Sequence, residues 1–281
     1  MKTTTPEDLL KVGAHLGHKK QKVHPKSRRY IYKIESGVSI IDLFKTADKL
    51  QEAKEFVRQL GVDQKVLLFV ATKKTARDTV GELCAAEGFN HMTNKWIAGF
   101  LTNFQEISKN IKEMRQLRQD KEEGNWKKFV KHEQTALEKK LNRIASIYHG
   151  VEKLDKKPDA IFVVDAKKEK NAITEADTMD ITTIGIVDTN CDPGCVKYTI
   201  PANDDAIASV KLIAEAIVSA YAEGLRGAAI AKVKEEAKTE KAAAKVVAKE
   251  QEKEAKKEKK KVTPKKPAPK KTIKKTVKKA S

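Results

Sequence analysis

Continuous apolar runs that alternate with helical patterns constrain the fold of this chain more than any other feature. The first run, KVLLFVA, covers residues 65–71, and two further runs cover residues 160–164 and 183–187. Strands that are apolar on both faces are typical of a parallel sheet, because helices cover both of its faces. Apolar residues at helical spacing over 46–60, 73–87, 169–179 and 204–224 provide such helices. The alternation predicts an α/β fold with a doubly wound parallel sheet.

Two other stretches of the sequence predict elements outside this alternation. Residues 30–34 and 38–43 are rich in β-forming residues and are joined by Glu35, Ser36 and Gly37, which predicts a hairpin or two adjacent strands. Residues 105–157 contain no convincing strand, and their apolar residues fall at i, i+3, i+4 spacing on either side of a turn at Gly124 and Asn125. This pattern predicts two long antiparallel helices that project from the sheet domain.

Charge divides the chain unevenly. The formal net charge is +19, and residues 228–281 hold 20 Lys and 7 Glu with few large apolar residues, so this segment is expected to be a disordered, Lys-rich tail. The remainder is mildly basic, which fits contact with phosphate along one face, although charge alone discriminates poorly. We therefore expect three parts: an α/β domain (1–104 with 158–227), a helical hairpin (105–157) and the tail (228–281).

Cysteine content and the start of the chain indicate the compartment. Cys84, Cys191 and Cys195 form no even-numbered framework, and the polar start MKTTTPEDLLKVG has no apolar signal region. No apolar run approaches the ~18 residues that a membrane span requires. The sequence predicts a reduced, cytoplasmic location.

Two motifs lie where a predicted strand ends or a predicted helix begins. The segment TKKTARD has none of the glycines that a dinucleotide needs, and Lys73, Lys74 and Arg77 suit an extended polyanion, or simply a solvated helix start. In KWIAGFLTNF, Thr102 and Asn103 can cap the next helix. Contact of Lys95 and Asn103 with nucleic acid is the alternative.

Acidic residues near the ends of strands raise the question of a metal. The loop IVDTNCDPG lacks the Gly and Glu of a calcium loop, and two cysteines without a second pair do not close a zinc site. If the loops converge, a divalent ion, zinc or magnesium, could be bound by His18, Asp188, Asp204 and Asp205. The alternative is that Asp204 and Asp205 only serve the following helix N-terminus. No G-x-S-x-G, Walker or H-E-x-x-H motif supports an enzyme.

Several long motifs, in order, resemble the bacterial small-ribosomal-subunit protein S-two family over roughly residues 5–227. They are GAHLGH (13–18), HPK (24–26), YIY (30–32), IIDL (40–43), VATKK (70–74), WIAGFLTNF (96–104), PDAIFVVD (158–165), IVDTNCDP (186–193) and IPANDDAI (200–207).

The resemblance implies a Rossmann-like, three-layer α/β domain with a protruding coiled-coil hairpin. It also implies a structural protein at the head–body junction of the small subunit, without enzymatic activity, that contacts small-subunit ribosomal RNA, neighbouring proteins and ribosomal protein S-one. In the family, such a hairpin is a feature of the bacterial and organellar branch. The lack of a recognisable transit peptide favours the bacterial one.

Shape and charge should dominate recognition of folded RNA. Charge and strand-end placement predict two RNA-binding patches. The first is made of Lys19, Lys20, Lys22, Lys26, Arg28 and Arg29, and the second of Lys73, Lys74, Arg77 and Lys95, with Asn103 as a further RNA-binding candidate. The rival hypotheses are a metal-dependent α/β enzyme, which needs a deep pocket beside the acidic residues, and a protein-docking module whose binding is insensitive to salt.

Overall fold

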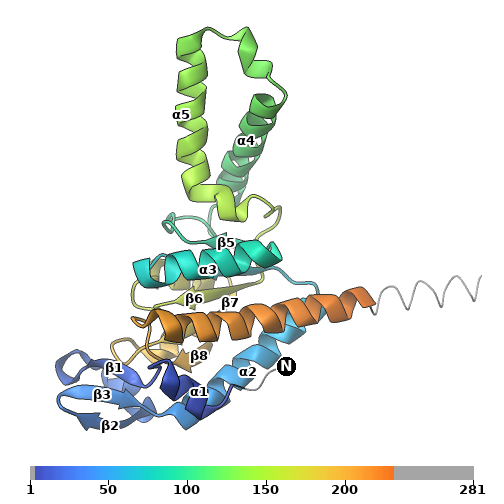
Figure 1. Ribbon diagram of the computed structural model, residues 1–281. Helices are drawn as coiled ribbons and strands as arrows, with labels where there is room; N and C mark the ends of the chain where they lie inside the picture. The colour runs from blue at the N-terminus through green and yellow to red at the C-terminus, as the bar shows by residue number, and fades with distance from the viewer. Residues whose placement is uncertain (1–3, 231–281) are drawn as a thin grey trace, which may run out of the picture. The chain divides into compact units, whose positions relative to one another are not determined.

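A computed structural model describes residues 4–230, and its centre is a parallel sheet of five strands (Figure 1). The strand order is β5-β4-β6-β7-β8, and every neighbouring pair is parallel. The strands are β4 (Leu67–Val70), β5 (His91–Met92), β6 (Ala160–Val164), β7 (Thr182–Val187) and β8 (Tyr198–Pro201). The predicted doubly wound α/β fold is confirmed, although the short strands β5 and β8 lack the continuous apolar runs that reveal the other three.

Helices cover both faces of this sheet, so the domain has three layers. One face packs against α2 (Leu43–Val62), α3 (Lys74–Glu87) and a helix over residues 207–230, while the other packs against α6 (Lys170–Thr178) and the base of the hairpin. Side chains alternate between the two layers: Phe69 and Phe162 face the first, and Leu68 and Ile161 face the second. Burial on both faces explains why β4 and β6 are apolar throughout.

A second, antiparallel sheet of three strands precedes the main sheet. Its strands are β1 (Leu16–Lys19), β2 (Ile31–Glu35) and β3 (Val38–Ile41), in the order β1-β3-β2. The hairpin between β2 and β3 is confirmed; it turns at Ser36 and Gly37, both with positive φ. Before it, α1 (Pro6–Lys11) begins with a capping box between Thr5 and Asp8. Two 3₁₀ turns, η1 (Lys20–Lys22) and η2 (Pro25–Tyr30), connect β1 to β2.

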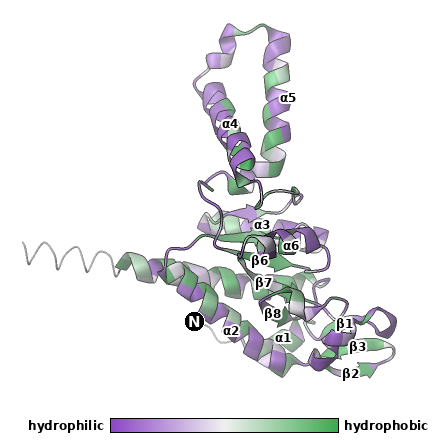
Figure 2. Cartoon of the chain, turned by 180° about the vertical axis from the view of Figure 1, so that it is seen from behind, coloured by the Kyte–Doolittle hydropathy of each residue, from purple (hydrophilic) through white to green (hydrophobic). Residues whose placement is uncertain are grey.

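The inserted hairpin consists of α4 (Phe104–Glu122) and α5 (Lys131–Tyr148), joined by η3 (Asn125–Lys128) and followed by η4 (His149–Val151). At its base Ile111, Met114 and Ile144 belong to the same apolar cluster as Leu68 of the sheet. Toward its tip Trp126 is buried beneath the ammonium group of Lys121. Figure 2 shows hydrophilic and hydrophobic residues alternating along both helices, the pattern of an amphipathic pair.

Some predicted boundaries were wrong for local reasons. The last helix begins at residue 207 instead of 204, because the Asn203 side chain accepts hydrogen bonds from the backbone N–H groups of Asp205 and Ala206 and forms a turn. The helix predicted over 46–60 is longer in the structure, where α2 runs from Leu43 to Val62. The predicted tail lies almost entirely outside the described residues. Within residues 4–230 no helix is long and apolar enough to cross a membrane.

Candidate functional site

The carboxyl edge of the parallel sheet gathers polar residues from four strands. Because β4, β6, β7 and β8 are parallel, the residues that follow them meet at one edge. The chain reverses its direction of winding between β4 and β6, and this switch point is where α/β sheets commonly bind ligands. Here side chains of the protein bridge it: Lys168 Nζ donates to the Thr72 carbonyl at 2.7 Å, and the Thr72 hydroxyl donates to buried Glu169.

Lys73 is the cation at the centre of this edge. Its Nζ lies 2.7 Å from carboxylate oxygens of Asp204 and Asp205 and 3.3 Å from Asp165. Burial alone would lower the pKa of Lys73, but hydrogen bonds to Asp204 and Asp205 raise it above its ordinary value. Burial raises the pKa of Asp204 to about 6, and repulsion from Asp165 adds to this, so desolvation outweighs its pairing with Lys73. Lys73 therefore holds three strand-end loops together.

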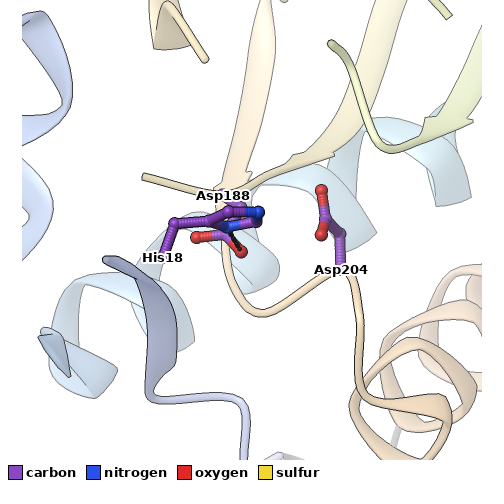
Figure 3. Close-up of side chains that lie close together, drawn as sticks. All are labelled: His18, Asp188 and Asp204. Carbon is purple, nitrogen blue, oxygen red and sulfur yellow. Dashed lines mark hydrogen bonds and ion pairs between the residues drawn. The ribbon is translucent and has the colours of Figure 1, made fainter. Parts of the chain in front are cut away.

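His18 reaches the same edge from β1 (Figure 3). Its Nδ1 lies 2.8 Å from Oδ2 of Asp188, which follows β7, and its Nε2 lies 2.9 Å from the Asn190 side-chain amide. The hydrogen bond to Asp188 raises the pKa of His18. The Thr189 hydroxyl accepts a hydrogen bond from the His18 backbone N–H at 2.9 Å. These contacts attach the amino-terminal sheet to the carboxyl edge of the main sheet.

The four residues considered for a metal lie close together in the structure. One ligand atom from each of His18, Asp188 and Asp204 falls within 4.8 Å of the others, and Asp205 Oδ2 lies 3.8 Å from His18 Nε2. Imidazole nitrogen with carboxylate oxygens is a donor set that zinc accepts, whereas magnesium prefers oxygen alone. Three carboxylates, of Asp165, Asp204 and Asp205, face the ammonium of Lys73, and the carboxylate of Asp188 faces His18. This excess of negative charge also favours a cation. An ion would compete with Lys73 for Asp204 and Asp205.

An exposed basic segment lies beside this cluster. Lys26 pairs with Asp192 at 2.6 Å, and the guanidinium of Arg29 lies over the Tyr30 ring at 4.8 Å. The segment is held by two hydrogen bonds: the Ser27 hydroxyl donates to the Cys191 carbonyl, and the His24 N–H donates to the Thr189 carbonyl. The six predicted basic residues of this segment are all exposed: Lys19, Lys20, Lys22, Lys26, Arg28 and Arg29.

The second predicted basic patch is less uniform. Lys74, Arg77 and Lys95 are exposed, and Arg77 pairs with neighbouring Asp78 at 2.9 Å. Lys73 differs from them, because its ammonium is engaged by carboxylates. Asn103 is exposed at the start of α4, but its side chain makes no capping hydrogen bond, so the expectation that it caps this helix was wrong in that respect.

The loop WIAGFLTNF is organised by a residue that the sequence did not reveal. Glu175 of α6 accepts hydrogen bonds from the Trp96 indole N–H and from the backbone N–H groups of Gly99 and Leu101. Trp96 itself is buried. Asp165 and Asn190 were also missed. Asp165 directly follows the predicted strand over residues 160–164, and Asn190 lies in the loop IVDTNCDPG after the predicted strand over 183–187. Placement at the end of a strand was therefore the signal that could have found them.

Asp188, one of the clustered acidic residues, borders a small cavity. The cavity that reaches Asp188 has about 10 Å³, lined also by Ser27, Thr189 and Pro201. That volume suits roughly one water molecule. This cavity is too small to be the deep pocket that the enzyme hypothesis requires.

Fold and site together define a class of protein: a three-layer α/β domain with an inserted helical hairpin, whose sheet edge carries a self-paired charged cluster and an exposed basic segment. Comparison with known families assigns the chain to one of them. The family model described as Ribosomal protein S2 matches residues 9–224, about three quarters of the chain. The protein belongs to the ribosomal protein S2 family and is a structural protein of the small ribosomal subunit.

Proposed function

We propose that this protein binds small-subunit ribosomal RNA through phosphate and sugar contacts and catalyses no reaction. The observation that carries the proposal is the exposed segment over residues 19–29, where six cationic side chains project from a backbone anchored to the sheet edge. A fixed array of cations matches the fixed phosphate array of a folded RNA helix without a large ordering cost. Lys74, Arg77, Lys95 and Asn103 extend this surface, and Lys73 positions its loop.

The test is RNA binding by the full chain at several salt concentrations. The triple variant Lys20→Gln, Lys22→Gln, Arg28→Gln is compared with Lys65→Gln, Lys156→Gln, Lys157→Gln, an equal charge change next to the amino ends of β4 and β6. We expect the first variant to bind small-subunit RNA more weakly. Its salt dependence should fall by about 0.7–0.9 in the log–log slope for each lost phosphate contact. Equal loss in both variants would show non-specific attraction and reject this surface.

We also propose that the hairpin and the sheet domain bind different partners. The RNA-binding part comprises residues 1–104 and 158–227, and the hairpin comprises residues 105–157. Phe129 and Val130 are 47% and 56% exposed near the tip of the hairpin. Exposed apolar side chains there favour contact with a protein, among which we count neighbouring small-subunit proteins and ribosomal protein S-one. Binding of isolated S-one to the full chain and to Phe129→Ser, Val130→Ser tests this; unchanged binding places S-one elsewhere.

His18, Asp188, Asp204 and Asp205 are proposed to bind a divalent ion, with zinc favoured by the imidazole donor. The full chain, dialysed against zinc and then against buffer, should retain the metal, and His18→Ala should not. Asp180→Asn, which alters an exposed carboxylate outside the cluster, is the control. Retention by His18→Ala would reject these ligands.

A further inference from the structure

The loop after β7 contains two thiols in contact. Cys191 Sγ and Cys195 Sγ lie 3.9 Å apart, and both residues are half-buried. The turn between them is tight: the Cys195 N–H donates to the Asp192 carbonyl, and the Asp192 carboxylate accepts the Gly194 N–H at 2.8 Å. The 3₁₀ turn η5 (Pro193–Cys195) ends at the second thiol. The backbone thus keeps the two sulfur atoms adjacent, and only a small movement separates them from the ~2.05 Å of a disulfide bond.

Cys195 is also accessible from outside. It lines a surface cavity of about 450 Å³ together with Asp177, Thr183, Gly194 and Lys197. Cys84, the third cysteine, is fully buried in α3. A small reagent can therefore reach the 191–195 pair while Cys84 stays protected.

We propose that Cys191 and Cys195 form a redox-active dithiol site, which a low-molecular-weight disulfide such as oxidised glutathione converts to an intramolecular disulfide. In the first step Cys195 loses its proton to solvent, and its thiolate attacks one sulfur of the reagent, forms a mixed disulfide and releases one glutathione thiolate. In the second step Cys191, after losing its proton to solvent, attacks Cys195 Sγ and releases the second glutathione thiolate. Two protein thiols are oxidised and one molecule of reagent is reduced to two thiols.

Closure of this bond has a consequence for the basic segment. The Cys191 carbonyl accepts the Ser27 hydroxyl at 2.5 Å, and Asp192, between the two cysteines, pairs with Lys26. The disulfide would tighten the same loop that holds residues 24–29, and this movement would strain these two contacts. Oxidation is therefore expected to increase the rate of backbone amide hydrogen exchange in residues 24–29. The disulfide itself does not depend on the proposed binding of RNA.

The experiment treats the full chain with oxidised glutathione under native conditions and follows intact and peptide masses. We expect a loss of two hydrogens, located in the peptide that contains residues 191–195, without change at Cys84. Cys191→Ser should accumulate a stable mixed disulfide at Cys195, and Cys195→Ser should react much more slowly. Cys84→Ser, the matched control, should form the disulfide as the parent does.

The same reaction in urea shows whether the fold is responsible. Pre-positioned thiols should close the disulfide about tenfold or more faster in the native chain than in the unfolded chain. Equal rates in the two states, or stable glutathione adducts on both cysteines of the parent, would overturn the proposal.

Discussion

Gly17 shows how one residue determines the approach of two sheets. A Cβ atom at this position would lie 2.8 Å from Thr189 Cγ2 and 3.1 Å from the Ser39 carbonyl oxygen. Thr189 cannot easily rotate away, because its hydroxyl accepts the His18 N–H and donates to the Asp188 carboxylate. The second glycine of GAHLGH is thus required by close packing at the sheet edge.

Gly17→Ala is therefore expected to lower the free energy of unfolding by about 1–3 kcal/mol, the usual cost of overpacking. Thermal or urea unfolding measures it. The control is Gly81→Ala in α3, where the nearest atom to a new Cβ lies 3.7 Å away and alanine favours the helix. A Gly17→Ala variant as stable as the parent would show that Thr189 yields without cost.

Glu169 illustrates the cost of a buried acid. Its side chain is 3% exposed and accepts a hydrogen bond from the Thr72 hydroxyl. Burial raises the pKa of Glu169 more than its hydrogen bonds and the charge of Lys168 lower it. The folded state therefore binds a proton at higher pH than the unfolded state does. Stability contributed by this group falls as pH rises through its folded pKa and is regained as pH falls toward the unfolded value.

Glu169→Gln should be more stable than the parent at neutral pH, because glutamine keeps an acceptor for Thr72 and carries no charge. The advantage should shrink as pH falls through the raised pKa of Glu169, because the parent carboxyl then gains its proton. Urea unfolding of both proteins at several pH values measures the difference. A difference that does not change with pH would argue against titration of Glu169.

At the scale of elements, α2 and the helix over residues 207–230 cross at two glycines. A Cβ atom on Gly224 would lie 2.2 Å from the Arg58 carbonyl oxygen, and one on Gly61 would lie 2.7 Å from the Tyr221 carbonyl oxygen. Both obstacles are backbone atoms, so neither can move without moving a helix. Gly61 lies within α2 and serves this crossing.

Gly224→Ala should force the two helices apart and lower the free energy of unfolding by about 1–3 kcal/mol. Gly227→Ala, in the same helix with no atom near the new Cβ, should be neutral or slightly stabilising. Urea unfolding followed by circular dichroism compares the two. Equal stability of both variants would contradict the crossing.

At the scale of the whole described unit, the hairpin and the sheet share one apolar cluster. Ile107, Ile111 and Met114 of α4 and Ile144 of α5 belong to the cluster that includes Val70 and Val163 of the sheet. The distal half of the hairpin contributes less to it, through Trp126 and the flanking Leu117 and Leu137. The base of the hairpin is thus part of the domain core, although the segment appears as an insertion in the sequence.

Replacing residues 117–137 by a short Gly-rich turn should leave a cooperatively folded protein, whereas deleting 105–157 should abolish cooperative thermal unfolding. The deletion exposes the sheet face that Ile111 and Met114 cover, and burial of apolar area is the main stabilising term. Calorimetry of both variants distinguishes them. A cooperative transition in the full deletion would show that the hairpin is an independent appendage.

The amino-acid sequence by itself determined the α/β class, the inserted helical pair and the family, because apolar periodicity and motif order are local properties that a chain displays before it folds. Tertiary structure alone decided that Lys73 pairs with three carboxylates, that Glu175 holds the WIAGFLTNF loop, and that Cys191 and Cys195 touch. It also decided where the sheet ends at β5 and β8. Those features depend on which strand lies beside which, and on how closely the backbones approach. Neither is encoded in the spacing of any one segment.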